Sequence, residues 1–216
     1  MIFVNFKTYK EASGKNTLSL TQTICDLASE TKVEIIACPQ AVDLRQVIEV
    51  SNRPVWTQHV DAVERGRATG WFPPEVAKEA GAEGTFLNHS EHKLSIGQLG
   101  EIMARCRQAG LKTLVFADSV EEAKVVSKFK PDYIGYEPQE LIASKTTSVS
   151  QEKPEIIRSV VKEVPKTAIL IGAGVKGRKD VQVGIKLGAT GIVLSSAVVL
   201  AKNPKEVLKD LVKGFK

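Results

Sequence analysis

TLVFADSVEEAKVVSKFKPDYIGY, residues 113–136, holds the plainest structural pattern in the chain. Thr113–Ala117 and Tyr133–Tyr136 are short apolar runs, which are typical of buried strands. Residues 119–129 between them carry apolar side chains at helical spacing, and Asp118 or Ser119 can cap the start of that helix. The stretch therefore predicts a strand, a helix and a second strand of one parallel sheet.

The same alternation continues toward both ends of the chain and gives eight strand–helix units. The other predicted strands are Ile2–Phe6, Val33–Cys38, Val55–His59, Gly84–His89, Ala168–Gly172 and Gly191–Ser195. The other predicted helices lie near 17–29, 41–50, 74–80, 96–109, 154–164, 179–187 and 204–213. Residues that favour helix ends support these bounds, namely Asn16, Pro154, Asn203 and Pro204 at starts and Gly81, Gly110 and Gly188 after ends.

Eight units in 216 residues average about 27 residues each, which is close to the shortest length for a (β/α)8 barrel. The same alternation is also compatible with an open, doubly wound parallel sheet. Because no linker or change of composition divides the chain, residues 1–216 are expected to form a single domain.

The composition, with 43% hydrophobic and 25% charged residues, is that of an ordinary globular protein and excludes collagen-like and disordered chains. The net charge of +5 is compatible with small anionic ligands. Basic residues are scattered among acidic ones and the few aromatic residues form no stacking series, so no nucleic-acid binding is expected. No apolar run has the length of a signal peptide or a membrane span.

Cys25, Cys38 and Cys106 lack CxxC spacing, which indicates reduced thiols and a cytoplasmic location.

Functional side chains of parallel α/β proteins lie at the carboxyl ends of strands. The first strand ends in Asn5-Phe6-Lys7, where a period of two places Asn5 and Lys7 on one side and Phe6 on the other. If Phe6 packs under helices, Asn5 and Lys7 point into the mouth of a barrel. A solvated strand end is the alternative.

The fourth and sixth strands end in residues suited to acid–base chemistry. His89 precedes residues that can start a helix, whose N-terminus would keep the imidazole neutral; a structural histidine is the alternative. Glu137 has aromatic and apolar neighbours, and desolvation there would raise its pKa and suit a general base. Pairing of Glu137 with a surface lysine is the alternative. Residues 139–147 are long enough to form a lid, and no histidine lies in a metal-binding motif.

An anion site is expected after the last two strands. Gly172-Ala173-Gly174 and Ser195-Ser196 are small residues, so backbone N–H groups there can approach a phosphate. A short helix beginning near Ser195 would add the dipole of its N-terminus. Loops after the seventh and eighth strands often bind phosphate in (β/α)8 barrels. A tight turn that needs glycine is the alternative for the first of these segments.

Together these segments resemble the triosephosphate isomerase family, in the short form typical of archaea. The order and spacing match over nearly the whole chain. The resemblance implies a TIM barrel that interconverts D-glyceraldehyde 3-phosphate and dihydroxyacetone phosphate in glycolysis and gluconeogenesis, without a metal or cofactor. The residues that carry it are Asn5-Phe6-Lys7, Asn88-His89-Ser90-Glu91, Tyr136-Glu137-Pro138-Gln139-Glu140-Leu141-Ile142, Gly172-Ala173-Gly174 and Ser195-Ser196.

The resemblance also implies residue roles. Glu137 would move the proton between C1 and C2 and His89 would be a neutral electrophile, which is the known arrangement of this family. Lys7 would offset the negative charge of enediolate and phosphate. Asn5 would help to hold the substrate, and Glu91 would lie beside Lys7.

At the phosphate end, the resemblance implies binding by backbone N–H groups of Ile142, Gly174, Ser195 and Ser196. Three departures from the family pattern bear on this end. Ala143-Ser144 replaces a Gly-Thr-Gly sequence, Gly174 replaces a serine that contacts the closed lid, and Ser195-Ser196 replaces a glycine pair. The departures concern lid closure and phosphate affinity more than the reaction.

Residues 58–71 resemble the third loop of the family, which inserts into a neighbouring subunit. A homodimer, or the tetramer usual for archaeal forms, is therefore expected through the loop around Thr69. An ordinary surface loop is the alternative, but exposed Trp71 and Phe72 would be costly on a monomer.

Two other functions remain as alternatives. A different phosphate-binding barrel enzyme, such as an aldolase or a biosynthetic isomerase, shares the fold and the anion site. A Schiff-base aldolase would need a lysine on a barrel strand, where the sixth strand offers Glu137. A sugar-phosphate sensor without turnover would bind the same ligand, but would have no need of the His89 and Glu137 pair.

Overall fold

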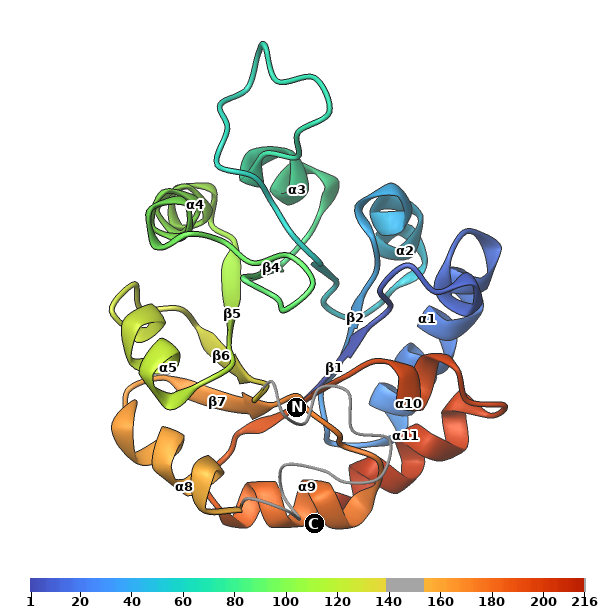
Figure 1. Cartoon of the computed structure of the whole chain (residues 1–216). Coiled ribbons are helices and arrows are strands. Elements are labelled where there is room, and N and C mark those ends of the chain that lie inside the picture. Colours follow the sequence, from blue (N-terminus) through green and yellow to red (C-terminus); the bar gives the residue numbers. More distant parts are fainter. Residues whose placement is uncertain (139–153, 216) are drawn as a thin grey trace.

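The computed structural model describes residues 1–138 and 154–215. In these residues, eight parallel strands form one sheet with helices around it (Figure 1). The strands are β1 (Ile2–Asn5), β2 (Ile35–Cys38), β3 (Trp56–Thr57), β4 (Gly84–Leu87), β5 (Lys112–Ala117), β6 (Tyr133–Tyr136), β7 (Ala168–Ile171) and β8 (Gly191–Leu194).

The strand order identifies a nearly closed barrel. Each strand from β3 to β8 pairs with its neighbour in sequence, and β1 pairs with both β2 and β8. A single bridge between Ala37 and Val55 joins β2 to the residue before β3. The open, doubly wound alternative is therefore wrong, because its strand order reverses in the middle of the sheet.

Nine helices lie in the described residues, and eight of them match the predicted positions. The ninth is α10, the short helix expected near Ser195, which has four residues and follows β8 directly. Short 3-10 turns lie at Lys10–Ala12, Ala41–Asp43 and Lys213–Phe215. The helices are α1 (Lys15–Glu30), α2 (Leu44–Val50), α3 (Pro74–Ala80), α4 (Ile96–Ala109), α5 (Val120–Ser127), α8 (Pro154–Glu163), α9 (Arg178–Lys186), α10 (Ser196–Val199) and α11 (Pro204–Val212).

The helix ends confirm two predicted N-caps and contradict one. The Ser119 hydroxyl accepts from the N–H of Glu122, and the side-chain Oδ1 of Asn203 accepts from the N–H of Glu206. Asn16 is not a cap, because α1 starts at Lys15, two residues before the predicted start, and its N-cap is Gly14, at φ 55°. The Asn16 side chain instead donates to the carbonyl of Lys10 (2.8 Å).

Alternation along the strands separates two buried layers. On β1, Ile2 and Val4 pack outward against the helices, whereas Phe3 points inward. Trp56 fills the barrel beside Gly84, where a Cβ atom would lie 2.6 Å from the indole ring, so only glycine leaves room for it. The interior layer comprises Phe3, Ile36, Cys38, Trp56, Phe86, Leu114, Phe116, Leu170 and Val193.

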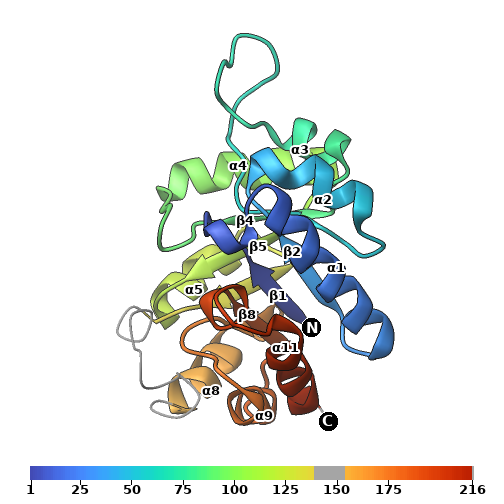
Figure 2. The ribbon, with the colours of Figure 1, turned by 90° about the vertical axis from the view of Figure 1, so that its right-hand side faces the viewer.

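The barrel places its strand ends and their loops on one face. Between β3 and α3 a long loop, residues 58–73 and here called the projecting loop, extends away from the barrel (Figures 1 and 2).

In the described part of the chain, no helix combines the length and apolarity needed to cross a membrane. The three cysteines are buried and free, and burial raises the pKa of the Cys106 thiol to about 12, so this thiol is not reactive.

Candidate active site

A cavity of about 480 Å³ opens at the carboxyl ends of the strands. This size suits a small ligand. Its lining comes from β1 and β8 and from the segments that follow β1, β4, β6, β7 and β8. The described residues that line it are Asn5, Lys7, His89, Ser90, Glu137, Gly172, Ala173, Gly174, Val175, Lys176, Val193, Leu194, Ser195, Ser196 and Ala197.

Lys7 enters the cavity from the end of β1 in an unusual backbone conformation. Its φ is 46°, in the left-handed region that side chains other than glycine rarely adopt. Hydrogen bonds hold this turn from both sides: the Lys7 N–H donates to Asn5 Oδ1 (3.0 Å), and Gln58 Nε2 donates to the Lys7 carbonyl (3.1 Å). The Lys7 ammonium lies 2.7 Å from Glu91 Oε1. Asn5, Lys7 and Glu91 are therefore close together.

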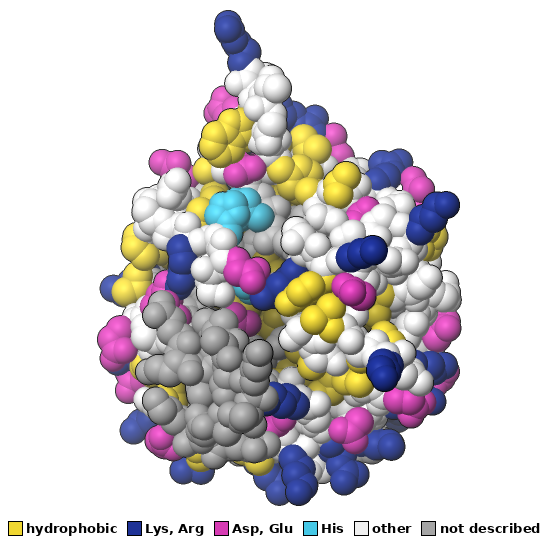
Figure 3. All heavy atoms as spheres, turned by 45° about the vertical axis from the view of Figure 1, so that its right-hand side comes forward, with side chains coloured by type: hydrophobic (Ala, Val, Ile, Leu, Met, Phe, Trp, Pro, Cys, Tyr) yellow, Lys and Arg dark blue, Asp and Glu magenta, His cyan; other side chains and the backbone are white. Residues whose placement is uncertain are grey.

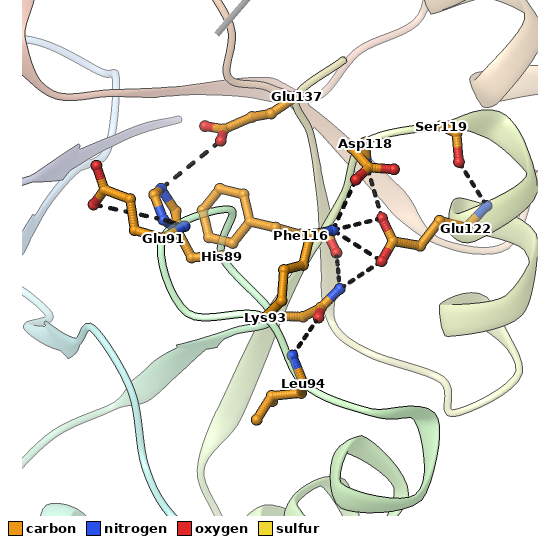
Figure 4. A network of polar contacts seen from close by, with 10 residues as sticks. His89, Glu91, Lys93, Leu94, Phe116, Asp118, Ser119, Glu122 and Glu137 are labelled. Carbon is orange, nitrogen blue, oxygen red and sulfur yellow. Dashed lines mark hydrogen bonds and ion pairs between the residues drawn. The ribbon is translucent and has the colours of Figure 1, made fainter. Parts of the chain in front are cut away.

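His89 presents one defined nitrogen to the cavity. The N–H of Glu91 donates to His89 Nδ1 (3.1 Å), so Nδ1 is an acceptor and a neutral ring carries its proton on Nε2. Nε2 lies 3.8 Å from Glu137 Oε2 (Figure 4). Burial, with smaller contributions from the charges of Lys7 and Lys93, lowers the pKa of His89 to about 4. The imidazole is therefore neutral at physiological pH.

Glu137 extends from the end of β6 toward His89, and its side chain is 13% exposed. Burial raises the pKa of this carboxyl to about 7, although the charge of Lys7 opposes the shift. A carboxyl with that pKa can both accept and release a proton near neutral pH. Gly172 leaves room for it, because a Cβ atom there would lie 2.6 Å from Glu137 Cδ.

The opposite side of the cavity contains small residues and backbone amides. Gly174 has φ 71°, which glycine adopts without strain. The Ser195 hydroxyl is buried, and the described residues offer it no hydrogen-bond partner. Ser196 begins α10, and the first N–H groups of a helix have no acceptor within the helix. These groups can bind an anion.

The predicted site residues fall into three groups. Asn5, Lys7, His89, Glu137, Gly174, Ser195 and Ser196 line the one cavity, and Glu91 lies at its rim in contact with Lys7 and His89. Ile142, Ala143 and Ser144 fall outside the described residues, as does the predicted lid at 139–147.

Sequence reasoning missed three cavity features: Ser90, Lys176 and the contact between Gly172 and Glu137. A basic residue just after the Gly172–Val175 turn is a signal that could have pointed to Lys176. The Gly172 contact joins residues on different strands and leaves no local signal.

Beside the cavity lies the base of the projecting loop. The rings of His59 and His92 stack at 4.0 Å between centroids, and His59 Nε2 is 3.4 Å from Asp61 Oδ1. In the space-filling view, histidine side chains lie between this loop and the charged side chains at the centre of the face (Figure 3). Trp71 is 59% exposed, whereas Phe72 is half-buried against the core.

The arrangement suits one kind of chemistry. A carboxylate with a raised pKa faces a neutral imidazole N–H, and a lysine ammonium lies close by. Abstraction of a proton beside a carbonyl needs such a base, together with donors where negative charge develops on oxygen. The amides across the cavity suit an anionic group on the same molecule.

Comparisons with known proteins agree with this geometry. The family model described as triosephosphate isomerase matches residues 1–213. Proteins named triosephosphate isomerase from Methanopyrus kandleri and Methanothermus fervidus are 43% and 38% identical to this chain; the alignments cover 99% and 98% of it and 97% of each relative. A protein of that name from Methanocaldococcus jannaschii is 36% identical, with 99% of both chains covered. The chain thus belongs to the triosephosphate isomerase family.

Proposed function

We propose that this chain interconverts D-glyceraldehyde 3-phosphate and dihydroxyacetone phosphate, a step of glycolysis and gluconeogenesis. The observation that carries the proposal is the facing pair of His89 Nε2 and Glu137 Oε2, 3.8 Å apart. Opposite shifts in pKa make this pair a neutral donor and a base that is active near neutral pH.

The reaction moves one proton between adjacent carbons. Glu137 removes the proton from the carbon beside the carbonyl, and the C–H electron pair forms the double bond of an enediolate. His89 donates a hydrogen bond from Nε2 to the oxygen on which charge develops, and the Lys7 ammonium stabilises that charge. Glu137 then returns the proton to the neighbouring carbon, so no atom is gained or lost.

Substrate binding is proposed at both ends of the cavity. Asn5 holds the turn of Lys7 at one end. At the other end, backbone N–H groups of Gly174, Ser195 and Ser196 bind the phosphate, and Ile142 joins them by analogy with the family. The proton transfers described need no metal and no organic cofactor.

The proposal extends to the location, the domain organisation and the oligomeric state of the enzyme. Three buried, free cysteines support a reducing, cytoplasmic location. The continuous eight-stranded sheet supports a single domain over residues 1–216. Exposed Trp71 on the projecting loop supports a homodimer or homotetramer through the loop around Thr69.

A coupled assay of glyceraldehyde 3-phosphate conversion, with no metal added, tests the function. Wild type is expected to turn over, and Glu137→Gln is expected to lose several decades of kcat, because glutamine cannot accept the proton. Each decade corresponds to about 1.36 kcal/mol of barrier. Glu163→Gln is the matched control, since Glu163 forms an exposed ion pair with Lys124.

Two outcomes would contradict the proposal. Full activity of Glu137→Gln would exclude Glu137 as the base. Binding of the triose phosphate by wild type without turnover would indicate a sensor, or an enzyme for another sugar phosphate.

A further inference from the structure

The segment that carries His89 is fastened to the start of α5 by one carboxylate. Glu122 Oε1 accepts a hydrogen bond from Asn88 Nδ2 (2.9 Å), and Glu122 Oε2 accepts one from the N–H of Asp118 (2.8 Å). Lys93 Nζ lies 3.0 and 2.9 Å from the two oxygens. Glu122 thus contacts residues on both sides of His89 in the chain, as Figure 4 shows for Lys93.

Asn88 transmits this contact to the backbone of His89. It is 2% exposed and has φ 57°, a left-handed conformation that asparagine tolerates better than most residues. Its side chain makes three hydrogen bonds. Besides the one to Glu122, Nδ2 donates to the Phe116 carbonyl (2.9 Å), and Oδ1 accepts from the N–H of Leu94 (3.0 Å). Because Asn88 directly precedes His89, its conformation sets the direction in which His89 leaves β4.

Phe116 links the same contacts to the imidazole itself. Its carbonyl binds Asn88, and its ring packs edge-on against the His89 ring, with 4.8 Å between centroids and 82° between planes. The N–H of Glu91 holds Nδ1 from the other side. The orientation of Nε2 therefore depends on how the His89 segment sits against β5 and α5.

The contacts of Glu122 can orient the segment that carries His89, but they contribute little to the stability of the fold. The side chains of Lys93 and Glu122 are 37% and 22% exposed, and ion pairs that water reaches stabilise a fold little. Asp118 Oδ2 lies 3.0 Å from the same ammonium, so Lys93 is held between two carboxylates. Glu122 itself lies outside the set of described residues that line the cavity.

We propose that Glu122 is a positioning residue for the isomerisation, acting through Asn88 and Lys93 to hold His89 Nε2 in line with the reacting oxygen. The inference rests on the proposed function, because it assigns His89 the role of the electrophile. Glu122 touches neither substrate nor reacting atoms. Its effect is on the geometry of a donor whose misplacement weakens stabilisation of the transition state.

The first test is Glu122→Gln, in which an amide nitrogen replaces an oxygen that accepts hydrogen bonds. We expect kcat to fall by about tenfold to a hundredfold, since small misplacements of catalytic groups have effects of that size. KM should change much less, because the phosphate end of the cavity is untouched. Glu121→Gln is the matched control: Glu121 is the exposed neighbour on α5, and its substitution should leave kcat unchanged.

A second variant, Asn88→Gly, keeps a backbone that tolerates φ 57° but removes all three side-chain hydrogen bonds. We expect a similar loss of kcat. The double variant should lose little more than the worse single variant, because both changes break one linkage. Asn88→Gly also keeps the test decisive if Glu122→Gln fails to fold.

The nitrogen NMR signals of His89 give a readout that does not depend on turnover. In wild type, the Nε2–H tautomer is expected; the signals should shift in Glu122→Gln and stay in place in Glu121→Gln. Unchanged kcat and unchanged His89 signals in Glu122→Gln, with or without a lower Tm, would overturn the inference. An inactive wild type would contradict the proposed function instead, which separates the two failures.

Discussion

At the scale of single residues, burial has opposite consequences for the two groups that face each other in the cavity. Transfer out of water disfavours the charged form of any group, so it raises the pKa of Glu137 and lowers that of His89. At pH values between about 4 and 7 both groups are therefore mostly neutral. The base becomes available only as pH rises toward 7.

The pH profile of kcat/KM follows from this order of titration. Below pH 7 we expect kcat/KM to fall about tenfold per pH unit, because Glu137, with a pKa of about 7, is protonated in the free enzyme. Above it a plateau is expected, without a falling limb from His89, which is already neutral. Steady-state kinetics from pH 5 to 9 provide the check. A profile that is flat through pH 7 would contradict the assignment.

The same shift predicts a pH-dependent gain in stability for Glu137→Gln. The pKa of Glu137 is higher in the folded chain, about 7, than the ordinary 4.5, so folding favours its protonated form. Wild type therefore loses free energy of unfolding as pH rises from about 4.5 through 7, by up to about 3 kcal/mol. Glutamine avoids this loss. Urea unfolding should show the variant to be more stable at pH 8 and equal to wild type near pH 4.5. An equal difference at both pH values would contradict the linkage.

Gly172→Ala is expected to reduce activity without unfolding the chain. The new Cβ would lie 2.6 Å from Glu137 Cδ, and the end of that side chain must move to make room. We expect kcat to fall about a hundredfold, with a change in free energy of unfolding of about 1 kcal/mol or less. Gly97→Ala is the control, because Gly97 is exposed in the first turn of α4 and a Cβ atom there meets nothing within 4 Å. Wild-type kcat in Gly172→Ala would exclude a steric role.

At the scale of elements, helix α4 begins with reciprocal hydrogen bonds between Ser95 and Gln98. The Ser95 hydroxyl accepts from the N–H of Gln98 (3.3 Å), and Gln98 Oε1 accepts from the N–H of Ser95 (3.0 Å). This capping box satisfies donors that the helix cannot satisfy internally. It also fixes where the segment that carries His89 ends and α4 starts.

Ser95→Ala should lower the free energy of unfolding by about 1 kcal/mol, because it removes the cap. For a chain of this length that corresponds to a fall in Tm of about 2–4 °C. Thr23→Ala is the comparison, since the Thr23 hydroxyl also makes a hydrogen bond, but to the Ser19 carbonyl within α1. Such bonds stabilise a helix little. Equal losses in the two variants, measured by thermal unfolding, would show that the cap contributes nothing special.

The elements themselves could largely be predicted from the sequence, because local rules decide them. Ser119 and Asn203 cap helices as their residue types suggest. Asn16 does not, because Gly14 adopts a left-handed conformation and starts α1 earlier. Helix α10 begins directly after Ser195, where the small residues and the anion site indicate a short helix, although four residues show no periodicity.

At the scale of the whole molecule, the barrel closes between β2 and β3, where few backbone hydrogen bonds join the strands. Strand β3 has two residues, and one bridge joins Val55 to Ala37 of β2. Aromatic side chains compensate inside the barrel: Phe3 packs against Trp56 at 4.9 Å between ring centroids and against Phe86 at 5.9 Å. Packing across the interior thus joins strands that backbone hydrogen bonds connect poorly.

The parts of the site that could be predicted are those that depend on local sequence rules, and not those that depend on contacts between residues far apart in the chain. Asn5, Lys7, His89 and Glu137 follow from a local rule, since the carboxyl ends of parallel strands meet on one face. The contact of Glu122 with Asn88 joins residues 34 positions apart. No periodicity or motif signals it, because it depends on how the segment after β4 meets the start of α5 once the barrel has closed.

The projecting loop gives the last expectation, which concerns assembly. Hydrogen bonds between Asp61 and Phe72 close its base, and next to Phe72 the chain exposes 59% of Trp71 to solvent. Exposed apolar surface of this kind favours contact with a second copy. Light scattering of wild type should give a multiple of 23.5 kDa, and Trp71→Glu should shift the mass toward a single chain. Val50→Glu is the control, because Val50 is 45% exposed at the end of α2 and should leave the mass unchanged. A wild-type mass of one chain, or an equal effect of both variants, would contradict assembly through this loop.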